Sequence, residues 1–317
     1  MSEENQVDDV KREAPCPYFG KCGGCTAQHI KYDVQLNNKQ RQVQHLLRHY
    51  STDEVEVFSD DEFWYRNRMD FSFHPEGLGF RKKGDWQTII DIKECMISNT
   101  KLNEILAEVK EFFFTNNPNK LDVFDIHRKH GTFRYAVIRT PKEGSSVSFV
   151  LNQTSTKIDE AIQLITQFAE KTEVENIIIT YVPHKTDTTI SAEYYVLKGE
   201  DVLTERFEDH TFDFHVQGFF QNNSVMAEIM LNYVHERIKK YEPHGKHLVD
   251  LYGGVGTFGI INNKLFKSTT IVEDFEGSIQ IAKRNIAKNE QKGITCVVKD
   301  AKFLKNVELP DKLIMIT

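Results

Sequence analysis

Three cysteines crowd the beginning of the chain in a pattern that could gather thiolates round one inorganic centre. Cys16, Cys22 and Cys25 are separated by short stretches that contain three glycines. Several thiolates must converge to bind a metal or a cluster, and glycines let a short loop fold round it. Cys95 follows an expected strand and could supply a fourth thiolate. The spacing therefore favours metal binding over buried free cysteines.

The residues alone do not decide which centre these thiolates would hold. Four thiolates suit tetrahedral zinc or an iron–sulfur cluster. The gap between Cys16 and Cys22 is longer than in paired zinc ligands, and it departs from the Cys-x3-Cys-x2-Cys pattern of radical S-adenosylmethionine enzymes. Zinc and iron–sulfur both stay open at this point. The fifth cysteine, Cys296, lies in an expected strand and is interpreted as an inert core thiol.

A second chemical feature is a glycine-rich turn after an apolar strand, within His247–Gly259. Glycines at the carboxyl end of a strand let the backbone approach a ligand closely. Glu273 ends the next expected strand, where a carboxylate can hold both ribose hydroxyls of a nucleoside. Asp300 ends the third strand and could meet the adenine edge. The segment therefore predicts a site for a nucleoside-containing cofactor.

Two cofactors compete for this turn. Gly254, Gly256 and Gly259 fit Gly-x-Gly-x-x-Gly, which is the pattern of NAD-binding folds. The acidic residue Asp250, before the loop in Asp-Leu-Tyr-x-Gly-x-Gly-x-Phe, favours S-adenosylmethionine.

The elements that position these residues change character along the chain. A polar helix is expected at Lys31–His49, and the stretch after it mixes strands with two helices, which predicts an α+β region with a largely antiparallel sheet. The expected strands are Tyr65–Phe73, Trp86–Ile92, Arg134–Arg139, Ser146–Leu151, Ile177–Val182 and Thr188–Val196, and the helices are Asn99–Phe114 and Lys157–Lys171.

After Phe214 short apolar runs alternate with helical stretches, which is typical of a parallel sheet built from βαβ units. The expected helices are Ser224–Tyr241 and Ser278–Lys288, and the expected strands are His247–Tyr252, Thr270–Glu273, Thr295–Lys299 and Lys312–Ile316. A doubly wound sheet rarely stops at its fourth strand, so we expect the sequence to be C-terminally truncated.

Several motifs together resemble one family, the RNA uracil-C5 methyltransferases with a [4Fe–4S] cluster. They occur in family order: Cys16–Cys25 followed by Gln28 and His29, Tyr65–Phe73, Leu78–Arg81 leading to Asp91–Cys95, and the Phe-Phe-Gln motif of Phe219–Asn223. The resemblance covers residues 16–317.

The resemblance implies a set of cofactor residues. It places a [4Fe–4S] cluster on Cys16, Cys22, Cys25 and Cys95, and S-adenosylmethionine contacts on Gln221, Tyr252, Thr257, Glu273 and Asp300. Without the family, Gln221 would be interpreted as a helix-start residue and Tyr252 as an aromatic core residue.

The resemblance also implies a fold and a domain order. The fold class is α/β, with an incomplete C-terminal class I (Rossmann-like) methyltransferase domain, an α+β middle domain and a small iron–sulfur region. The expected segments are 1–15, a disordered lead-in; 16–62, the cluster region and helix; 63–215, the middle domain that supplies Cys95; and 216–317, the methyltransferase domain.

The activity implied is transfer of a methyl group from S-adenosylmethionine to C5 of a uridine in rRNA or tRNA. A cysteine thiolate adds to C6 and a base removes the C5 proton. The family's Asp-Pro-Pro-Arg loop, nucleophilic cysteine and general-base glutamate are expected beyond Thr317, so this chain is expected not to methylate by itself. The family usually has cysteine where this chain has Gly253, a change expected to be tolerated.

Bulk properties limit the partners. The hydrophobic share is 39%, the charged share 27% and the net charge −7, which argues mildly against a protein that coats nucleic acid. Neither a membrane span nor a secretory signal is evident, and a cytoplasmic monomer is expected. One group of cations could touch RNA phosphates or form a solvated basic face: Arg66, Arg68, Arg81, Lys82 and Lys83.

Two alternatives remain from other classes of protein. One is a non-catalytic RNA-binding iron–sulfur protein with a degenerate methyltransferase half. The other is an NAD-linked oxidoreductase with a zinc site.

Overall fold

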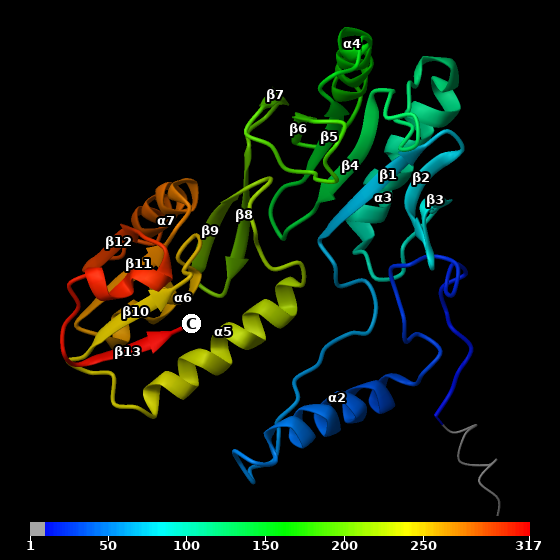
Figure 1. Cartoon of the computed structure of the whole chain (residues 1–317). Coiled ribbons are helices and arrows are strands. Elements are labelled where there is room, and N and C mark those ends of the chain that lie inside the picture. Colours follow the sequence, from blue (N-terminus) through cyan, green and yellow to red (C-terminus); the bar gives the residue numbers. More distant parts are fainter. Residues whose placement is uncertain (1–9) are drawn as a thin grey trace, which may run out of the picture. The chain divides into compact units, whose positions relative to one another are not determined.

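The computed structural model describes residues 10–317, which form two compact units (Figure 1). The first unit runs to Arg139 and includes Val147–Leu197; the second contains Thr140–Ser146 and Lys198–Thr317. The sequence instead placed a division at 215/216, after residues that here belong to the second unit. The finer four-part division stays a prediction, and residues 1–9 of its lead-in lie outside the described residues.

The first unit is built on a seven-stranded sheet with the order β3-β2-β1-β4-β5-β6-β7. Strand β1 runs antiparallel to both β2 and β4, and β2 runs antiparallel to β3. The bounds are β1 Arg68–His74, β2 Gly77–Lys82, β3 Asp85–Asp91, β4 Phe133–Arg139, β5 Ser146–Asn152, β6 Asn176–Val182 and β7 Tyr194–Lys198. These antiparallel pairings agree with the antiparallel sheet that the sequence predicts for this region.

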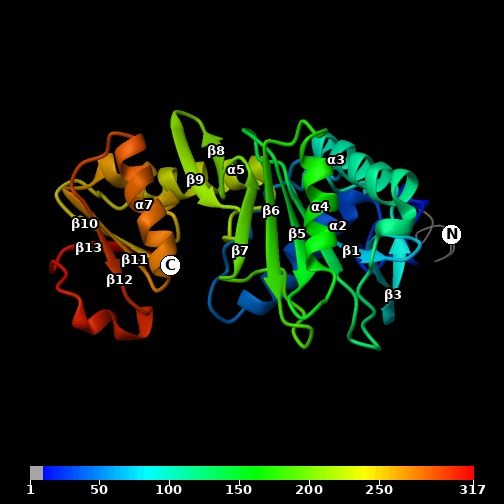
Figure 2. The same ribbon diagram turned by 90° about the horizontal axis from the view of Figure 1, so that it is seen from above.

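One face of this sheet carries the main hydrophobic core. Helices α3 (Thr100–Lys110) and α4 (Ile158–Ala169) bury their apolar sides there (Figure 2). Phe71 and Phe73 of β1 point into this core, whereas Asp70 and Ser72 alternate with them, as the two-residue period of a strand requires. The sheet therefore has an apolar face under the helices and an opposite face with polar side chains on β1.

Helix α3 does not end where the sequence predicts. It continues into a π-helical stretch, Glu111–Asn116, followed by a 3-10 turn at Pro118–Lys120. Both Phe112 and Phe113 are buried there. A helix with the wider i→i+5 repeat thus brings two successive aromatic rings into the core.

Helix α2 (Tyr32–Leu47) lies close to the bounds predicted from the sequence, but none of its residues is buried. Its amide side chains attach it to the segment that follows. Gln40 Nε2 donates to the Val55 carbonyl at 2.8 Å, and Gln44 bonds to the backbone of both Asp53 and Val55 at 2.8 Å. Polar contacts therefore take the place of an apolar interface along this helix.

The second unit contains a parallel four-stranded sheet with the order β12-β11-β10-β13. The bounds are β10 His247–Leu251, β11 Ser268–Glu273, β12 Ile294–Val298 and β13 Leu313–Ile316. The parallel pairing confirms the arrangement predicted from alternating apolar and helical stretches. The connecting elements are α6 Thr257–Asn262, the 3-10 turn Asn263–Leu265, α7 Glu276–Lys288 and the 3-10 segment Ala301–Asn306.

A hairpin and a long helix precede this sheet. The hairpin joins β8 (Val202–Phe207) to β9 (His210–His215), and helix α5 spans Ser224–Lys239. Asn285 of α7 ties the hairpin to the sheet's helices, because it accepts from Asp213 N at 2.8 Å and donates to the Asp213 carbonyl at 3.0 Å. In the described part of the chain, no helix combines the length and apolar character needed to traverse a bilayer.

Candidate cofactor site and cysteine cavity

The carboxyl ends of β10, β11 and β12 meet at one edge of the parallel sheet. Leu251 pairs with Val272, and Glu273 pairs with Val298. This register brings the glycine turn after β10 beside Glu273. The strand order reverses between β10 and β13, and ligands of open α/β sheets bind at such a reversal. The turn that the sequence singled out therefore lies where this fold binds cofactors.

Glu273 is held in place by backbone N–H groups. Its Oε1 accepts from Asp274 N at 3.0 Å and from Phe275 N at 3.1 Å, and its Oε2 accepts from Gly254 N at 3.0 Å. A carboxylate offers about four acceptor positions, so about one remains for a ligand. A ribose with two hydroxyls would have to displace one backbone donor, and Gly254 is the donor contributed by the glycine turn.

Asp250 lies beneath this edge and is fully buried. Its Oδ2 accepts from Gly259 N at 2.7 Å, which fixes the first turn of α6. Burial raises the pKa of the Asp250 carboxyl to about 7; the Gly259 N–H opposes this rise, and the nearby Glu273 adds to it. Asp250 therefore stabilises the glycine turn through its hydrogen bond with Gly259 N.

The raised pKa predicts how the second unit responds to pH. Below about pH 4 the carboxyl is protonated in the folded and unfolded states alike, so its contribution to stability is fully present. As pH rises toward about 7 the unfolded state releases the proton first, and that contribution is lost. We expect Asp250→Asn to remove this loss of stability. This change in stability is measured by hydrogen exchange of the 247–260 amides at about pH 5 and about pH 8.

The exposed Asp274→Asn serves as the matched control, and it should keep the wild-type pH dependence. Equal pH dependence in the Asp250→Asn and wild-type proteins would contradict the assignment of this titration to Asp250.

Of the remaining predicted cofactor residues, two belong to the glycine turn and two lie in other segments of the chain. Tyr252 is 72% exposed with φ +58°, and Thr257 begins α6, so both belong to the glycine turn. Asp300 caps the segment after β12, and its contacts with Lys302 lower the pKa of its carboxyl. Gln221 occupies an exposed position in the segment between β9 and α5.

The sequence analysis missed one aromatic side chain at this edge. Phe275 comes two residues after Glu273 and is 66% exposed. A large exposed ring beside a nucleoside-type site suits stacking on a base. The only signal in the sequence was its place directly before the start of α7.

The structure brings the four predicted cysteine ligands round one cavity of about 170 Å³ in the first unit: Cys16, Cys22, Cys25 and Cys95. Most of the other lining side chains are apolar. Among residues 10–317, however, no three or more His, Cys, Asp or Glu side chains are arranged to hold a metal ion. The structure thus supports the gathering of the four cysteines and leaves the bound centre as a prediction.

Neighbouring amides position these cysteines. Buried Gln28 accepts from Cys16 N at 3.2 Å, and Asn103 of α3 both accepts from Cys95 N at 2.9 Å and donates to the Cys95 carbonyl at 3.1 Å. Burial raises the pKa of the Cys22 and Cys25 thiols, an effect partly offset by hydrogen bonds to their sulfurs. The loop and the helix are therefore both fixed to the cavity.

Cys296 lies on β12 in the second unit, where burial raises the pKa of its thiol. A raised pKa disfavours the reactive thiolate. The residue is only partly buried, so its interpretation as an inert core thiol stays a prediction.

The five predicted cations do not form one basic face. Arg68 forms a two-point ion pair with Asp70 at 3.0 and 3.1 Å, and Arg66 lines the cysteine cavity. Arg81, Lys82 and Lys83 line a separate, larger groove.

Together, an α/β sheet with a glycine turn and a facing carboxylate defines a nucleoside-cofactor fold. Comparison with known proteins identifies the family. The sequence profile of the tRNA (Uracil-5-)-methyltransferase family matches residues 31–306. The chain belongs to this family.

Similar proteins include two archaeal enzymes named tRNA (uracil(54)-C(5))-methyltransferase. That of Pyrococcus abyssi is 32% identical, over 86% of this chain and 63% of the relative; that of Pyrococcus horikoshii is 30% identical, over 90% and 66%. A crystal structure of the Pyrococcus abyssi enzyme in complex with S-adenosyl-L-homocysteine matches with a TM-score of 0.71 and 29% identity. It covers 88% of this chain and 66% of that one. The chain therefore spans about two thirds of the length of these relatives.

Proposed function

We propose that this protein transfers a methyl group from S-adenosylmethionine to C5 of a uridine in RNA, with tRNA as the preferred class over rRNA. The observation that carries the proposal is the pairing of Glu273 with the glycine turn at the strand-order reversal, in a chain of the uracil-5-methyltransferase family. The relatives named for uridine 54 of tRNA favour tRNA. A cytoplasmic monomer is part of the proposal.

The residues of this chain would bind and orient the cofactor. Glu273 accepts the ribose hydroxyls, Phe275 stacks on the adenine, and the glycine turn brings backbone close to the rest of the molecule. Tyr252, Thr257 and Asp300 would line the same edge, and Gln221, in the segment before α5, would supply a further polar contact to the cofactor. S-adenosylmethionine supplies an electrophilic methyl group when it is bound.

The nucleophile is expected to be none of the five cysteines in this sequence. Four line the cavity of the first unit, and burial on β12 keeps Cys296 a thiol. The family resemblance predicts a catalytic cysteine and a general base. Neither role is assigned to any of these five cysteines.

The test of this function is methyl transfer by the gene product that carries this sequence, since the chain spans about two thirds of its relatives. We expect label from S-adenosylmethionine to appear as 5-methyluridine in unmodified tRNA and not in rRNA fragments. Label at rRNA alone would overturn the tRNA preference. Tight RNA binding without label in any RNA would favour the non-catalytic RNA-binding alternative.

We further propose that Cys16, Cys22, Cys25 and Cys95 hold a [4Fe–4S] cluster. Four thiols round one mostly apolar cavity suit the donor set of such a cluster. The cluster would clamp the N-terminal loop to the sheet, because methyl transfer itself requires no electron.

Removing one thiol is expected to remove the cluster. Protein prepared without oxygen should contain iron and sulfide with visible absorbance, and Cys95→Ser should lose most of all three. Cys296→Ser is the matched control, and it should keep them because its sulfur lies in the other unit. Zinc in place of iron in the wild-type protein, or an unchanged iron content in Cys95→Ser, would refute the assignment.

A further inference from the structure

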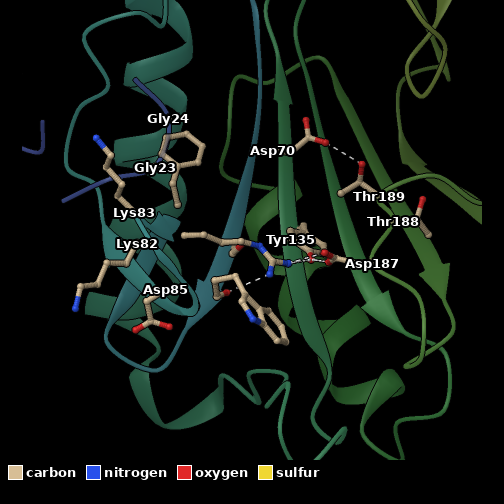
Figure 3. A pocket seen from close by; sticks show the side chains of 15 residues that line it. Gly23, Gly24, Asp70, Lys82, Lys83, Asp85, Tyr135, Asp187, Thr188 and Thr189 are labelled. Carbon is tan, nitrogen blue, oxygen red and sulfur yellow. Dashed lines mark hydrogen bonds and ion pairs between the residues drawn. The ribbon is translucent and has the colours of Figure 1, made fainter. Parts of the chain in front are cut away.

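A groove of about 850 Å³ lies on the first unit, on the sheet face opposite α3 and α4 (Figure 3). Asp70 and Ser72 of β1 line it, and they alternate with Phe71 and Phe73 of the core. The other walls come from three places: the loop at Gly23–Gly24, the β2–β3 hairpin and the segment Asp187–Thr189. Residues far apart in the sequence therefore build one surface hollow, which the proposed cofactor site does not use.

An exposed tryptophan is presented to this groove. Trp86, on the edge strand β3, is 57% exposed. The Arg81 guanidinium lies 5.6 Å from its ring centroid, and Arg81 also donates to the Trp86 carbonyl at 3.1 Å. Arg81 is anchored in turn by an ion pair of 2.7 Å with Asp187. The ring is thus steadied by a cation and keeps much of its surface in contact with water.

A second wall of the groove, formed by Tyr135 and the segment Asp187–Thr189, is polar and is held by hydrogen bonds. The Tyr135 hydroxyl donates to Asp187, and the Thr189 hydroxyl donates to Asp70 at 2.8 Å. Buried Arg134 holds this wall, because its guanidinium donates to the Pro183 carbonyl at 2.7 Å and also to the Thr186 carbonyl. Hydroxyls and carboxylates held this way offer donors and acceptors to the edge of a base.

Positive charge lies on the β2–β3 hairpin, which also carries Trp86. Lys82 and Lys83 are exposed and line the groove, and no ion pair within 4.0 Å is formed by either among residues 10–317. The groove also holds three carboxylates, but Asp70 and Asp187 are paired with arginines, which leaves Asp85 as the remaining acid. The charges suit a ligand with an anionic end near the lysines and a planar, polar body near Trp86.

We propose that this groove binds an unstacked nucleotide of single-stranded RNA, with its base against Trp86 and its phosphate at Lys82 and Lys83. The inference deepens the proposed function, on which it rests for RNA as the partner. Exposed aromatic rings on a sheet face, combined with cations that follow the backbone, are how proteins hold unpaired RNA. The groove thus holds the substrate strand at a place other than the methyl-transfer edge.

Tryptophan fluorescence tests this proposal, because the chain has only two tryptophans. In a Trp64→Phe protein Trp86 is the sole reporter, and a short single-stranded oligouridylate should quench it as a base stacks on the ring. Trp86→Ala should weaken binding of the oligouridylate by about 10-fold or more, since stacking contributes about 1–3 kcal/mol per base. Trp86→Phe should restore most of the affinity.

A paired substitution tests the phosphate end. Lys82→Ala with Lys83→Ala should lower the slope of log Kd against log salt by about 0.7, the contribution of one neutralised single-strand phosphate. The matched control is Lys239→Ala with Lys240→Ala, which removes two exposed lysines at the end of α5 and should leave the slope unchanged.

The outcomes separate the two proposals. If tRNA is methylated and binds Trp86→Ala as tightly as the parent protein, the groove assignment is wrong and the proposed function stands. If the oligouridylate quenches Trp86 and the lysine pair sets the salt slope, yet no RNA is methylated, the groove stands and the proposed function fails.

Discussion

Glu273→Gln is expected to weaken binding of S-adenosyl-L-homocysteine by about 10- to 100-fold, since hydrogen bonds to a charged group contribute about 1.5–3 kcal/mol. The amide keeps the shape of the side chain but loses the charge, and one of its two ends becomes a donor. That end would face either the ribose hydroxyls or the backbone N–H groups of Gly254, Asp274 and Phe275. Isothermal titration calorimetry with the product analogue gives the change in Kd directly.

The control for this experiment is Glu276→Gln, which changes an exposed acid in the first turn of α7. It removes the same charge three residues away and should leave the Kd within about twofold, because exposed charges are screened. Glu273→Gln with the affinity of the parent protein would show that the ribose is held elsewhere.

The second large effect concerns stability. Phe113→Ala is expected to lower the free energy of unfolding of the first unit by about 3–5 kcal/mol, as for other buried phenylalanines. The ring is fully buried and lies 5.1–5.9 Å between centroids from Phe73, Phe133, Phe149 and Phe168. Its removal leaves a void between the π-helical stretch and the sheet. Urea titration followed by tryptophan fluorescence reports on this unit, which holds both tryptophans.

Phe58→Ala provides the comparison within the same unit, because Phe58 is 41% exposed. Its expected cost is well below that of Phe113→Ala. Equal costs for the two substitutions would show that Phe113 does not contribute to the core as its burial implies.

The parallel sheet was predictable because its strands are short apolar runs, and a helical segment or a glycine turn follows β10, β11 and β12. Strand β10 and the turn at Gly253–Gly256 carry that signal in consecutive residues. The β8–β9 hairpin was missed for the opposite reason. Its two connecting residues are Glu208 and Asp209, and Glu208 adopts φ +47° without the glycine or asparagine that normally marks such a turn.

Tertiary contacts overrode local preference elsewhere. The run Thr188–Val196 is rich in β-formers, but only Tyr194–Lys198 forms β7. Arg134 and Arg81 hold the preceding segment through Thr186 and Asp187, and neither partner is near it in the sequence. Contacts between residues far apart in the sequence also form the groove at Trp86. No local sequence pattern predicts this groove.

At Gly253 this chain departs from the cysteine that the resemblance predicts, and the local packing explains why glycine fits there. A Cβ built there would lie 2.6 Å from Ile271 Cγ2 and 3.2 Å from the Asp250 carboxyl carbon. Glycine thus fits this backbone, and the expectation that the departure from the family's cysteine is tolerated stays a prediction.

The loop that carries Cys16, Cys22 and Cys25 also forms part of the groove that we propose to bind RNA. Gly23 N donates to the Arg81 carbonyl at 2.9 Å and Lys83 N donates to the Lys21 carbonyl at 2.7 Å, while Gly24 and Phe80 line both hollows. If this loop detached, the parallel sheet and most of the core would be unchanged, but the proposed RNA groove would lose one of its walls. Under these proposals, oxidation of the cysteine sulfurs is expected to weaken binding of RNA before it weakens binding of the methyl donor.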